Sequence, residues 1–346
     1  LLDAVNANAA LADSDDDLYD EQAAFGTLQE DEQIQAMNDE FNEAQISLKT
    51  IRDFIRFCVT KLREYDVVVA QGTTDVFAEA AAIVLHTLSL DWSADDQILD
   101  CRLTESEKSE VLTLLQRRII ERKPLSYLIN LAYFCDLPFY VDERVLIPRS
   151  PIGELIGKRF APWLNHEPLR VMDLCTGSGC IAIALAQAFP EAEVDAIDIS
   201  PDALDVTQIN IEMYGLEQQV VPMASDLMND LPAGLTYDLI VSNPPYVDAD
   251  DMFDLPDEFR HEPELALAAG EDGLILAKRI LATAGDRLSE QGILVVEVGN
   301  SYVHLQAQYP DVPFTWVEFE QGGHGVFVMT KAQLDACRDQ FAAYRS

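Results

Sequence analysis

From residue 169 onward, short apolar strands alternate with helix-like segments, and this alternation limits the fold more than any other feature. Repeated strand–helix units form a mostly parallel sheet with helices on both faces. Two strands that are adjacent at the end of the chain add an antiparallel edge. The sequence therefore predicts a doubly wound α/β domain, with strands at 169–174, 193–198, 220–224, 237–243, 292–298, 314–319 and 325–330.

The strand predicted at 237–243 runs into the turn Asn243-Pro244-Pro245-Tyr246. Its two prolines fix φ and lack N–H groups, so the turn is rigid and offers carbonyl acceptors but few donors. A planar NH2 group could be held between the Asn243 side-chain oxygen and the Pro244 carbonyl, against the flat face of Tyr246. These acceptors would raise electron density on an amide or aromatic amine nitrogen and aim it at an electrophile. The alternative is a proline-rich strand exit that only ends the sheet.

The first strand of this domain is followed by a glycine-rich loop and an apolar helix. Gly177 and Gly179 permit positive φ and the close approach of a ligand, and the helix N-terminus favours a negative group. Asp198 ends the next strand, where a carboxylate can accept from both hydroxyls of a ribose. Asp226 follows the third strand, where it could accept from an adenine amino group. Several strand ends thus predict one nucleoside-shaped site.

The loop segment 177–182 also fits the dinucleotide fingerprint, so a nicotinamide enzyme is a rival on this loop alone. The turn at 243–246 favours a methyltransferase, because methyl transfer to a planar nitrogen needs such a turn, whereas hydride transfer does not. The two motifs together predict S-adenosylmethionine as the cofactor, with Asp173 placed to help fix its methionine portion. We expect no metal site.

The chain has a formal net charge of −38 and a pI near 4.1. This charge argues against a protein that grips nucleic-acid phosphates across a broad face, and it suits either a basic protein partner or solubility alone. The six cysteines form no C-x-x-C pair and are expected to be reduced. Neither a signal peptide nor a membrane span is evident. We therefore expect a cytoplasmic protein that contacts neither a membrane nor a specific nucleic-acid sequence.

Composition and periodicity divide the chain into four parts. Residues 1–44 form an acidic leader with weak order and at most a short helix. Residues 45–131 show helical periodicity, and Thr104 and Glu107 are spaced as in a capping box. Residues 132–150 predict a β-hairpin and a stiff linker, and residues 151–346 carry the α/β domain.

These motifs together resemble the HemK/Prm family of protein glutamine methyltransferases. The resemblance rests on 173–179, Asp198, 243–246 and 145–149, and it extends from about residue 45 to the C-terminus. It implies a class I S-adenosylmethionine-dependent methyltransferase fold, preceded by a helical domain that recognises the substrate. The branch that modifies a glutamine of the third protein of the large ribosomal subunit is the most similar. The supporting segments are 173–180, 260–265, 297–300 and 322–327.

The resemblance also implies roles for individual residues. Residues 243–246 would hold the glutamine amide, and Asp226 with Leu227 would contact the adenine. Arg260, His261 and Glu262 would either shape the peptide entrance or form a loop salt bridge. The implied cofactor-binding set is Asp173, Cys175, Thr176, Gly177, Ser178, Gly179, Asp198, Asp226, Leu227 and Asn243.

Three other functions stay open on the sequence. A release-factor glutamine methyltransferase would share the fold, but that branch usually has glycine where Cys175 stands. A nucleic-acid amino methyltransferase faces the same geometric problem, since an exocyclic base amine is also planar. A catalytically idle ribosome-assembly factor would use the acidic body to chaperone a basic protein. The substrate could be the free ribosomal protein or an assembly intermediate.

Overall fold

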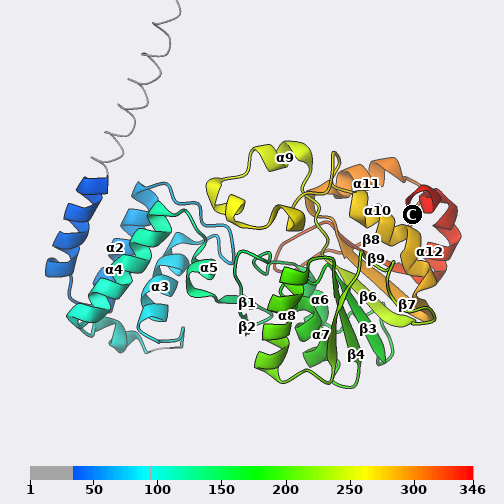
Figure 1. Ribbon diagram of the computed structural model, residues 1–346, viewed down its shortest axis with the longest axis horizontal. Helices are drawn as coiled ribbons and strands as arrows, with labels where there is room; N and C mark the ends of the chain where they lie inside the picture. Colours follow the sequence, from blue (N-terminus) through cyan, green and yellow to red (C-terminus); the bar gives the residue numbers. More distant parts are fainter. Residues whose placement is uncertain (1–33, 94, 346) are drawn as a thin grey trace, which may run out of the picture. The chain divides into compact units, whose positions relative to one another are not determined.

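The computed structural model describes residues 34–93 and 95–345 (Figure 1). The chain divides into two compact units. Within the described residues, the helical unit comprises 34–62 and 80–116 apart from 94, and the sheet unit comprises 63–79 and 117–345. Most of the leader predicted at 1–44 lies outside the described residues. Its last part belongs to a helix that spans 34–47.

The helical unit is built from amphipathic helices. The helix at 34–47 packs against α2 (Ile51–Glu64) through Phe41 and Phe57, whose ring centroids are 5.5 Å apart. The predicted apolar stripe of α2 is buried at Phe54, Cys58 and Leu62. The other two long helices are α3 (Val76–Thr87) and α4 (Glu105–Ile120).

The start of α4 confirms the predicted capping box. The backbone N–H of Thr104 donates to the Glu107 carboxylate at 2.7 Å, and the Glu107 N–H donates to the Thr104 hydroxyl at 3.3 Å. The N-terminal N–H groups of a helix have no partner within the helix, so these two bonds fix where α4 begins.

A short β-hairpin follows the helices along the chain and precedes the strands of the main sheet. After α5 (Leu125–Ile129), strand β1 (Ala132–Phe134) pairs antiparallel with β2 (Leu137–Phe139). The two turn residues, Cys135 and Asp136, have φ of +50° and +61°, as a tight hairpin turn requires. The hairpin is shorter than the predicted segment, and the linker after it is irregular as far as α6 (Ile152–Gly157).

The sheet unit contains a seven-stranded sheet in the order β5-β4-β3-β6-β7-β9-β8. The five strands from β3 to β7 run parallel, and β8 and β9 form an antiparallel edge. The predicted doubly wound architecture is therefore confirmed, although β8 is shorter than predicted. The strands are β3 (Arg170–Leu174), β4 (Glu193–Asp198), β5 (Val220–Ala224), β6 (Tyr237–Ser242), β7 (Leu288–Glu297), β8 (Thr315–Trp316) and β9 (Val326–Thr330).

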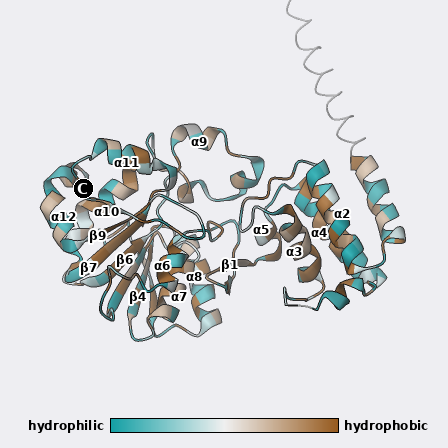
Figure 2. Ribbon diagram, turned by 180° about the vertical axis from the view of Figure 1, so that it is seen from behind, coloured by the Kyte–Doolittle hydropathy of each residue, from teal (hydrophilic) through white to brown (hydrophobic). Residues whose placement is uncertain are grey.

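Helices cover both faces of this sheet because alternate side chains of the buried strands point to opposite faces. Val171 packs in one buried cluster with α6 and α7, whereas its neighbour Met172 packs in a second cluster with α10 and α12. Figure 2 shows apolar residues concentrated in the strands. No helix within the described residues is long and apolar enough to cross a membrane. The helices are α7 (Cys180–Ala188), α8 (Pro201–Tyr214), α9 (Ala249–Phe253), α10 (Ile275–Thr283), α11 (Tyr302–Gln308) and α12 (Lys331–Cys337).

The strand order places a binding site beyond the carboxyl ends of the central strands. The chain builds outward from β3 to β5 and then returns to β6 on the other side of β3. Neighbouring loops diverge at such a switch point, which leaves a crevice beyond the carboxyl ends of the strands. The loops that follow β3 and β6 carry Cys175 and Asn243 to this crevice.

Candidate active site

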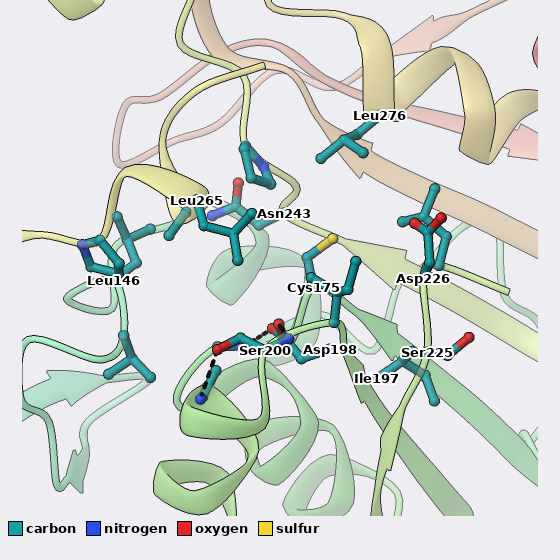
Figure 3. A pocket seen from close by; sticks show the side chains of 18 of the residues that line it. Leu146, Cys175, Ile197, Asp198, Ser200, Ser225, Asp226, Asn243, Leu265 and Leu276 are labelled. Atoms are coloured by element: carbon teal, nitrogen blue, oxygen red, sulfur yellow. Dashed lines mark hydrogen bonds between the residues drawn. The ribbon is translucent and has the colours of Figure 1, made fainter. Parts of the chain in front are cut away.

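A cavity of about 200 Å³ lies at the carboxyl ends of β3, β4, β5 and β6 (Figure 3). The linker before α6 and the loop after α9 complete its wall. The predicted site residues that line it are Cys175, Gly177, Asp198, Asp226, Leu227, Asn243 and Pro245. The strand order therefore brings most of the predicted nucleoside site together with the Asn-Pro-Pro-Tyr turn.

The loop after β3 is shaped by three residues with positive φ. Cys175, Gly177 and Gly179 have φ of +61°, +57° and +79°. A Cβ on Gly179 would lie 2.9 Å from the Thr207 methyl group, so the contact with α8 requires glycine there. A Cβ on Gly177, in contrast, would meet no atom of the described residues within 4 Å. The space beside the Gly177 Cα is therefore part of the open cavity.

Asp173 holds this loop from below. It is fully buried, and its Oδ2 accepts from the Thr176 hydroxyl at 2.6 Å and from the Ala182 N–H at 3.1 Å. Burial raises the pKa of the Asp173 carboxyl to about 7. Asp173 does not line the cavity, so it supports the loop and the start of α7 from beneath.

Asp198 lines the cavity at the end of β4 and organises the two loops beside it. One carboxylate oxygen accepts from the Gly177 N–H and the other from the Ser200 N–H, both at 2.9 Å. Burial raises the pKa of the Asp198 carboxyl, and these two backbone bonds oppose that effect. Ser200 in turn caps α8 by accepting from the Ala203 N–H at 3.2 Å. Figure 3 shows Asp198 and Ser200 side by side in the cavity wall.

The third strand end carries a charged pair that the sequence analysis did not foresee. The guanidinium of Arg279, on α10, donates to Asp226 Oδ2 at 2.6 Å, and this bond holds the pKa of the Asp226 carboxyl below its usual value. Both residues line the cavity. The next residue, Leu227, is buried with φ of +53° and contributes an aliphatic wall where an aromatic ring could have stacked.

Some residues of the Asn-Pro-Pro-Tyr turn line the cavity, and others lie outside its lining. Asn243 and Pro245 line the cavity, whereas Pro244 is buried behind them. The Asn243 Oδ1 atom is buried, yet it accepts no hydrogen bond from any residue that the structure describes. A buried acceptor without a partner costs about 1–3 kcal/mol, and a donor on a ligand bound at this wall would remove that cost.

Tyr246 is not among the residues that line the cavity. Its hydroxyl donates to Glu297 Oε1 at 3.0 Å, and its ring lies so close to Gly299 that a Cβ there would be 2.5 Å from a ring carbon. Its backbone oxygen accepts from the Ser301 hydroxyl at 3.1 Å. The ring and the backbone of Tyr246 are therefore both fixed.

The side chains of the segment 260–262 contact other residues of the sheet unit. Arg149 donates to the two oxygens of Glu262 at 2.6 and 2.7 Å and lies over the Phe259 ring at 5.3 Å. The salt-bridge alternative thus holds for Glu262. His261 Nε2 lies 2.9 Å from the Glu121 carbonyl oxygen, and the exposed Arg260 lies 3.6 Å from Asp257.

Several predicted residues do not line the cavity, and several lining residues were not predicted. Ser200 carried a recognisable signal, because a serine followed by proline is typical of a helix start. Arg279 carried none, since it comes from a helix that is distant in sequence, whereas Leu265 lies in the segment 260–265 that supports the family resemblance. The predicted residues outside the lining are Asp173, Thr176, Ser178, Gly179, Pro244 and Tyr246.

The fold and the cavity define a class I methyltransferase, and the Methyltransferase small domain family matches residues 160–271. Over 296 residues the chain is 47% identical to the ribosomal protein uL3 glutamine methyltransferase of Neisseria meningitidis serogroup A, covering 85% of this chain and 97% of that protein. The serogroup B protein of the same name matches equally well. The chain belongs to the family of ribosomal protein uL3 glutamine methyltransferases, which confirms the resemblance found in the sequence.

Solved structures are similar to the chain at a lower level. A methyltransferase from Pyrococcus furiosus aligns with a TM-score of 0.41 and 16% identity, covering 56% of this chain and 88% of that one. The ribosomal protein L11 methylase of Lactobacillus delbrueckii subsp. bulgaricus aligns with a TM-score of 0.34 and 21% identity, covering 51% and 76%.

Proposed function

We propose that this chain transfers a methyl group from S-adenosylmethionine to the side-chain amide nitrogen of a glutamine in ribosomal protein uL3, in the cytoplasm. The single observation that carries the chemistry is the buried Asn243 Oδ1, which lacks a donor from the described residues at the wall of the cavity. The identity to relatives named for this activity supports the choice of substrate.

The cavity suits the cofactor in three respects. Asp198 offers carboxylate oxygens to a ribose, since each oxygen uses only one of its lone pairs on the backbone. Gly177 leaves open space where a ligand could approach the backbone. Burial raises the pKa of the Cys175 thiol, so the thiol stays protonated and does not attack an electrophile.

We assign the holding of the cofactor to residues 175–179 for the methionine portion, Asp198 for the ribose, and Asp226 with Leu227 for the adenine. Asp173 acts on it indirectly, by supporting the loop. When bound, S-adenosylmethionine supplies the methyl group, whose transfer breaks a C–S bond and forms a C–N bond, while one amide proton leaves to water. The Asp226 oxygen that does not bind Arg279 is the acceptor available for an adenine amino group.

The protein's own task is to hold the glutamine amide. Its NH2 group would donate one N–H to Asn243 Oδ1 and the other to the Pro244 carbonyl. Both acceptors belong to a proline-stiffened turn, so they lose little freedom when the substrate binds. Two acceptors on one NH2 group raise electron density on a nitrogen whose lone pair is otherwise delocalised.

We further propose that the helical region at about 45–131 recognises the substrate, and that the acidity of the chain favours a basic ribosomal protein. The net charge of −38 would raise the association rate with such a partner at low ionic strength. The sequence before residue 34 contributes to this charge.

The test is incubation with labelled S-adenosylmethionine and ribosomal proteins from a strain that lacks this chain. We expect label on one glutamine of uL3, located by mass spectrometry. Parallel reactions contain release factors, ribosomal RNA and assembly intermediates. Label confined to release factors or to nucleic acid would reject the proposed substrate, and the absence of label from every acceptor would reject the activity.

Replacing Gly177 by alanine tests the cofactor assignment without removing a functional group. Gly177 and Gly215 both have positive φ, and a Cβ at either would meet no described atom within 4 Å. Both alanine variants should therefore lose about 1–2 kcal/mol of stability from backbone strain. Only Gly177→Ala should also weaken S-adenosylmethionine binding, by about 10-fold or more in calorimetry. Equal affinities in the two variants would contradict the assignment.

A further inference from the structure

Glu297 does not line the cavity, yet its buried carboxyl contacts the Asn-Pro-Pro-Tyr turn. It ends β7, and Val296 before it pairs with Ser242 at the end of β6. Only 4% of Glu297 is exposed. Its Oε1 accepts from the Tyr246 hydroxyl at 3.0 Å and its Oε2 from the Ser150 hydroxyl at 2.5 Å.

This carboxyl joins two segments that are far apart in the sequence. Ser150 belongs to the linker before α6, where its hydroxyl also accepts from the Ile152 N–H at 3.2 Å. Tyr246 ends the turn that begins at Asn243. Glu297 therefore connects the linker to the turn through two hydrogen bonds, both donated to it by neutral hydroxyl groups.

Stability alone does not account for an ionisable group at this position. Burial raises the pKa of the Glu297 carboxyl to about 7, while the two hydroxyl bonds and the charge of Arg149 act in the opposite direction. Arg149 is itself engaged with Glu262, so Glu297 has no ion-pair partner of its own among the described residues. A neutral side chain would avoid the cost of burying a charge.

The ionised carboxyl has one property that a neutral side chain lacks. Both of its oxygens accept, so the Tyr246 and Ser150 hydroxyls can donate at the same time. A protonated carboxyl, or an amide, offers one acceptor and one donor. One of the two hydroxyls would then have to turn from donor to acceptor.

Resting on the proposed function, we propose that Glu297 is a positioning residue for methyl transfer, which orients Tyr246 and through it the Asn243–Pro245 turn. The direct partners of the substrate remain Asn243 and Pro244. Gly299 and Ser301 hold the ring and backbone of Tyr246, and Glu297 fixes the remaining free end of its side chain. The groups that act on Glu297 electrostatically are Arg149 from the linker and Tyr246 from the turn.

The test uses Glu297→Gln, Tyr246→Phe and the double variant in the full chain, assayed with uL3. We expect each single substitution to lower kcat about 10-fold, which corresponds to about 1.4 kcal/mol, and the double variant to be no slower than Tyr246→Phe. Affinity for S-adenosylmethionine should not change, because neither residue lines the cavity. The matched control is Glu290→Gln, an exposed glutamate on the same strand, which should behave as wild type.

The pH profile separates positioning from a merely structural role. Wild-type kcat should fall as the pH drops through about 7, where Glu297 takes up its proton. Glu297→Gln should lose the part of this acid limb that Glu297 contributes, and any limb that remains near pH 7 belongs to Asp173, whose pKa is also raised to about 7. If Glu297→Gln does not fold, Tyr246→Phe must lose the same part of the limb.

Two outcomes would overturn the inference while wild type remains active. One is a Glu297→Gln enzyme with the kcat and pH profile of wild type. The other is a double variant whose two losses multiply, because Glu297 would then act independently of Tyr246. A wild-type enzyme that labels no acceptor would instead reject the proposed function itself.

Discussion

Replacing Asn243 by alanine is expected to lower kcat/KM for uL3 methylation by about 10³-fold, the loss typical of removing one preorganised hydrogen-bonding group from an active site. The reason is geometric. Asn243 Oδ1 is the side-chain acceptor at the end of β6, and no described residue donates a hydrogen bond to it. An amide with only the Pro244 carbonyl as partner can rotate away from the electrophile. Labelled-methyl transfer at saturating cofactor measures the loss.

The matched control for this prediction is Asn165→Ala. Asn165 is exposed on the same unit and lies outside the cavity lining, so its variant should keep full activity. Calorimetry on Asn243→Ala should show cofactor affinity reduced far less than turnover, since the carboxylate of Asp198 is intact. Turnover within 10-fold of wild type would exclude Asn243 as the main holder of the amide. Loss of methylation in Asn243→Ala would also exclude the pure chaperone alternative, which predicts only that binding of uL3 survives.

The parts of the fold that could be predicted from sequence are those set by local pattern. Strand–helix alternation predicts the parallel sheet, because a buried strand and its covering helix each show their own periodicity. The same holds for the turn at 243–246, where two prolines restrict the backbone without help from the rest of the chain. The open loop around Gly177 belongs to this class as well.

The direction of individual side chains could not be predicted in the same way. The turn predicts that Tyr246 takes part in holding the amide, and this stays a prediction. The bond from its hydroxyl to Glu297 and the contact of its ring with Gly299 depend on β7, which is distant in sequence. The partner of Asp226 is Arg279, on α10. With 61 acidic and 23 basic residues in the chain, pairing between distant charges is underdetermined by sequence. The folded arrangement of strands and helices selects the partners, as it does for Asp226 and Arg279.

The second large effect is expected on stability, for Glu262→Ala. The Glu262 side chain is fully buried, and it accepts from both ends of the Arg149 guanidinium and from the Ile147 N–H at 3.1 Å. Removing it leaves a charge and a backbone donor without their partner. Breaking a buried pair costs about 3–5 kcal/mol, and we expect about 3 kcal/mol because Arg149 remains 28% exposed and water can reach it.

Urea unfolding monitored by tryptophan fluorescence measures this cost, since Trp163 and Trp316 both belong to the sheet unit. Glu264→Ala is the matched control: Glu264 is exposed two residues away, and its removal should change the free energy of unfolding by less than about 0.5 kcal/mol. The loss of unfolding free energy in Glu262→Gln should lie between those of Glu262→Ala and Glu264→Ala, because an amide still accepts one bond from Arg149 or Ile147. If Glu262→Ala were as stable as Glu264→Ala, the pair would not hold the linker to the loop that carries Pro263 and Leu265 into the cavity wall. If it is destabilised as expected, cofactor affinity should fall with it, since these two residues line the cavity only while that loop is held in place.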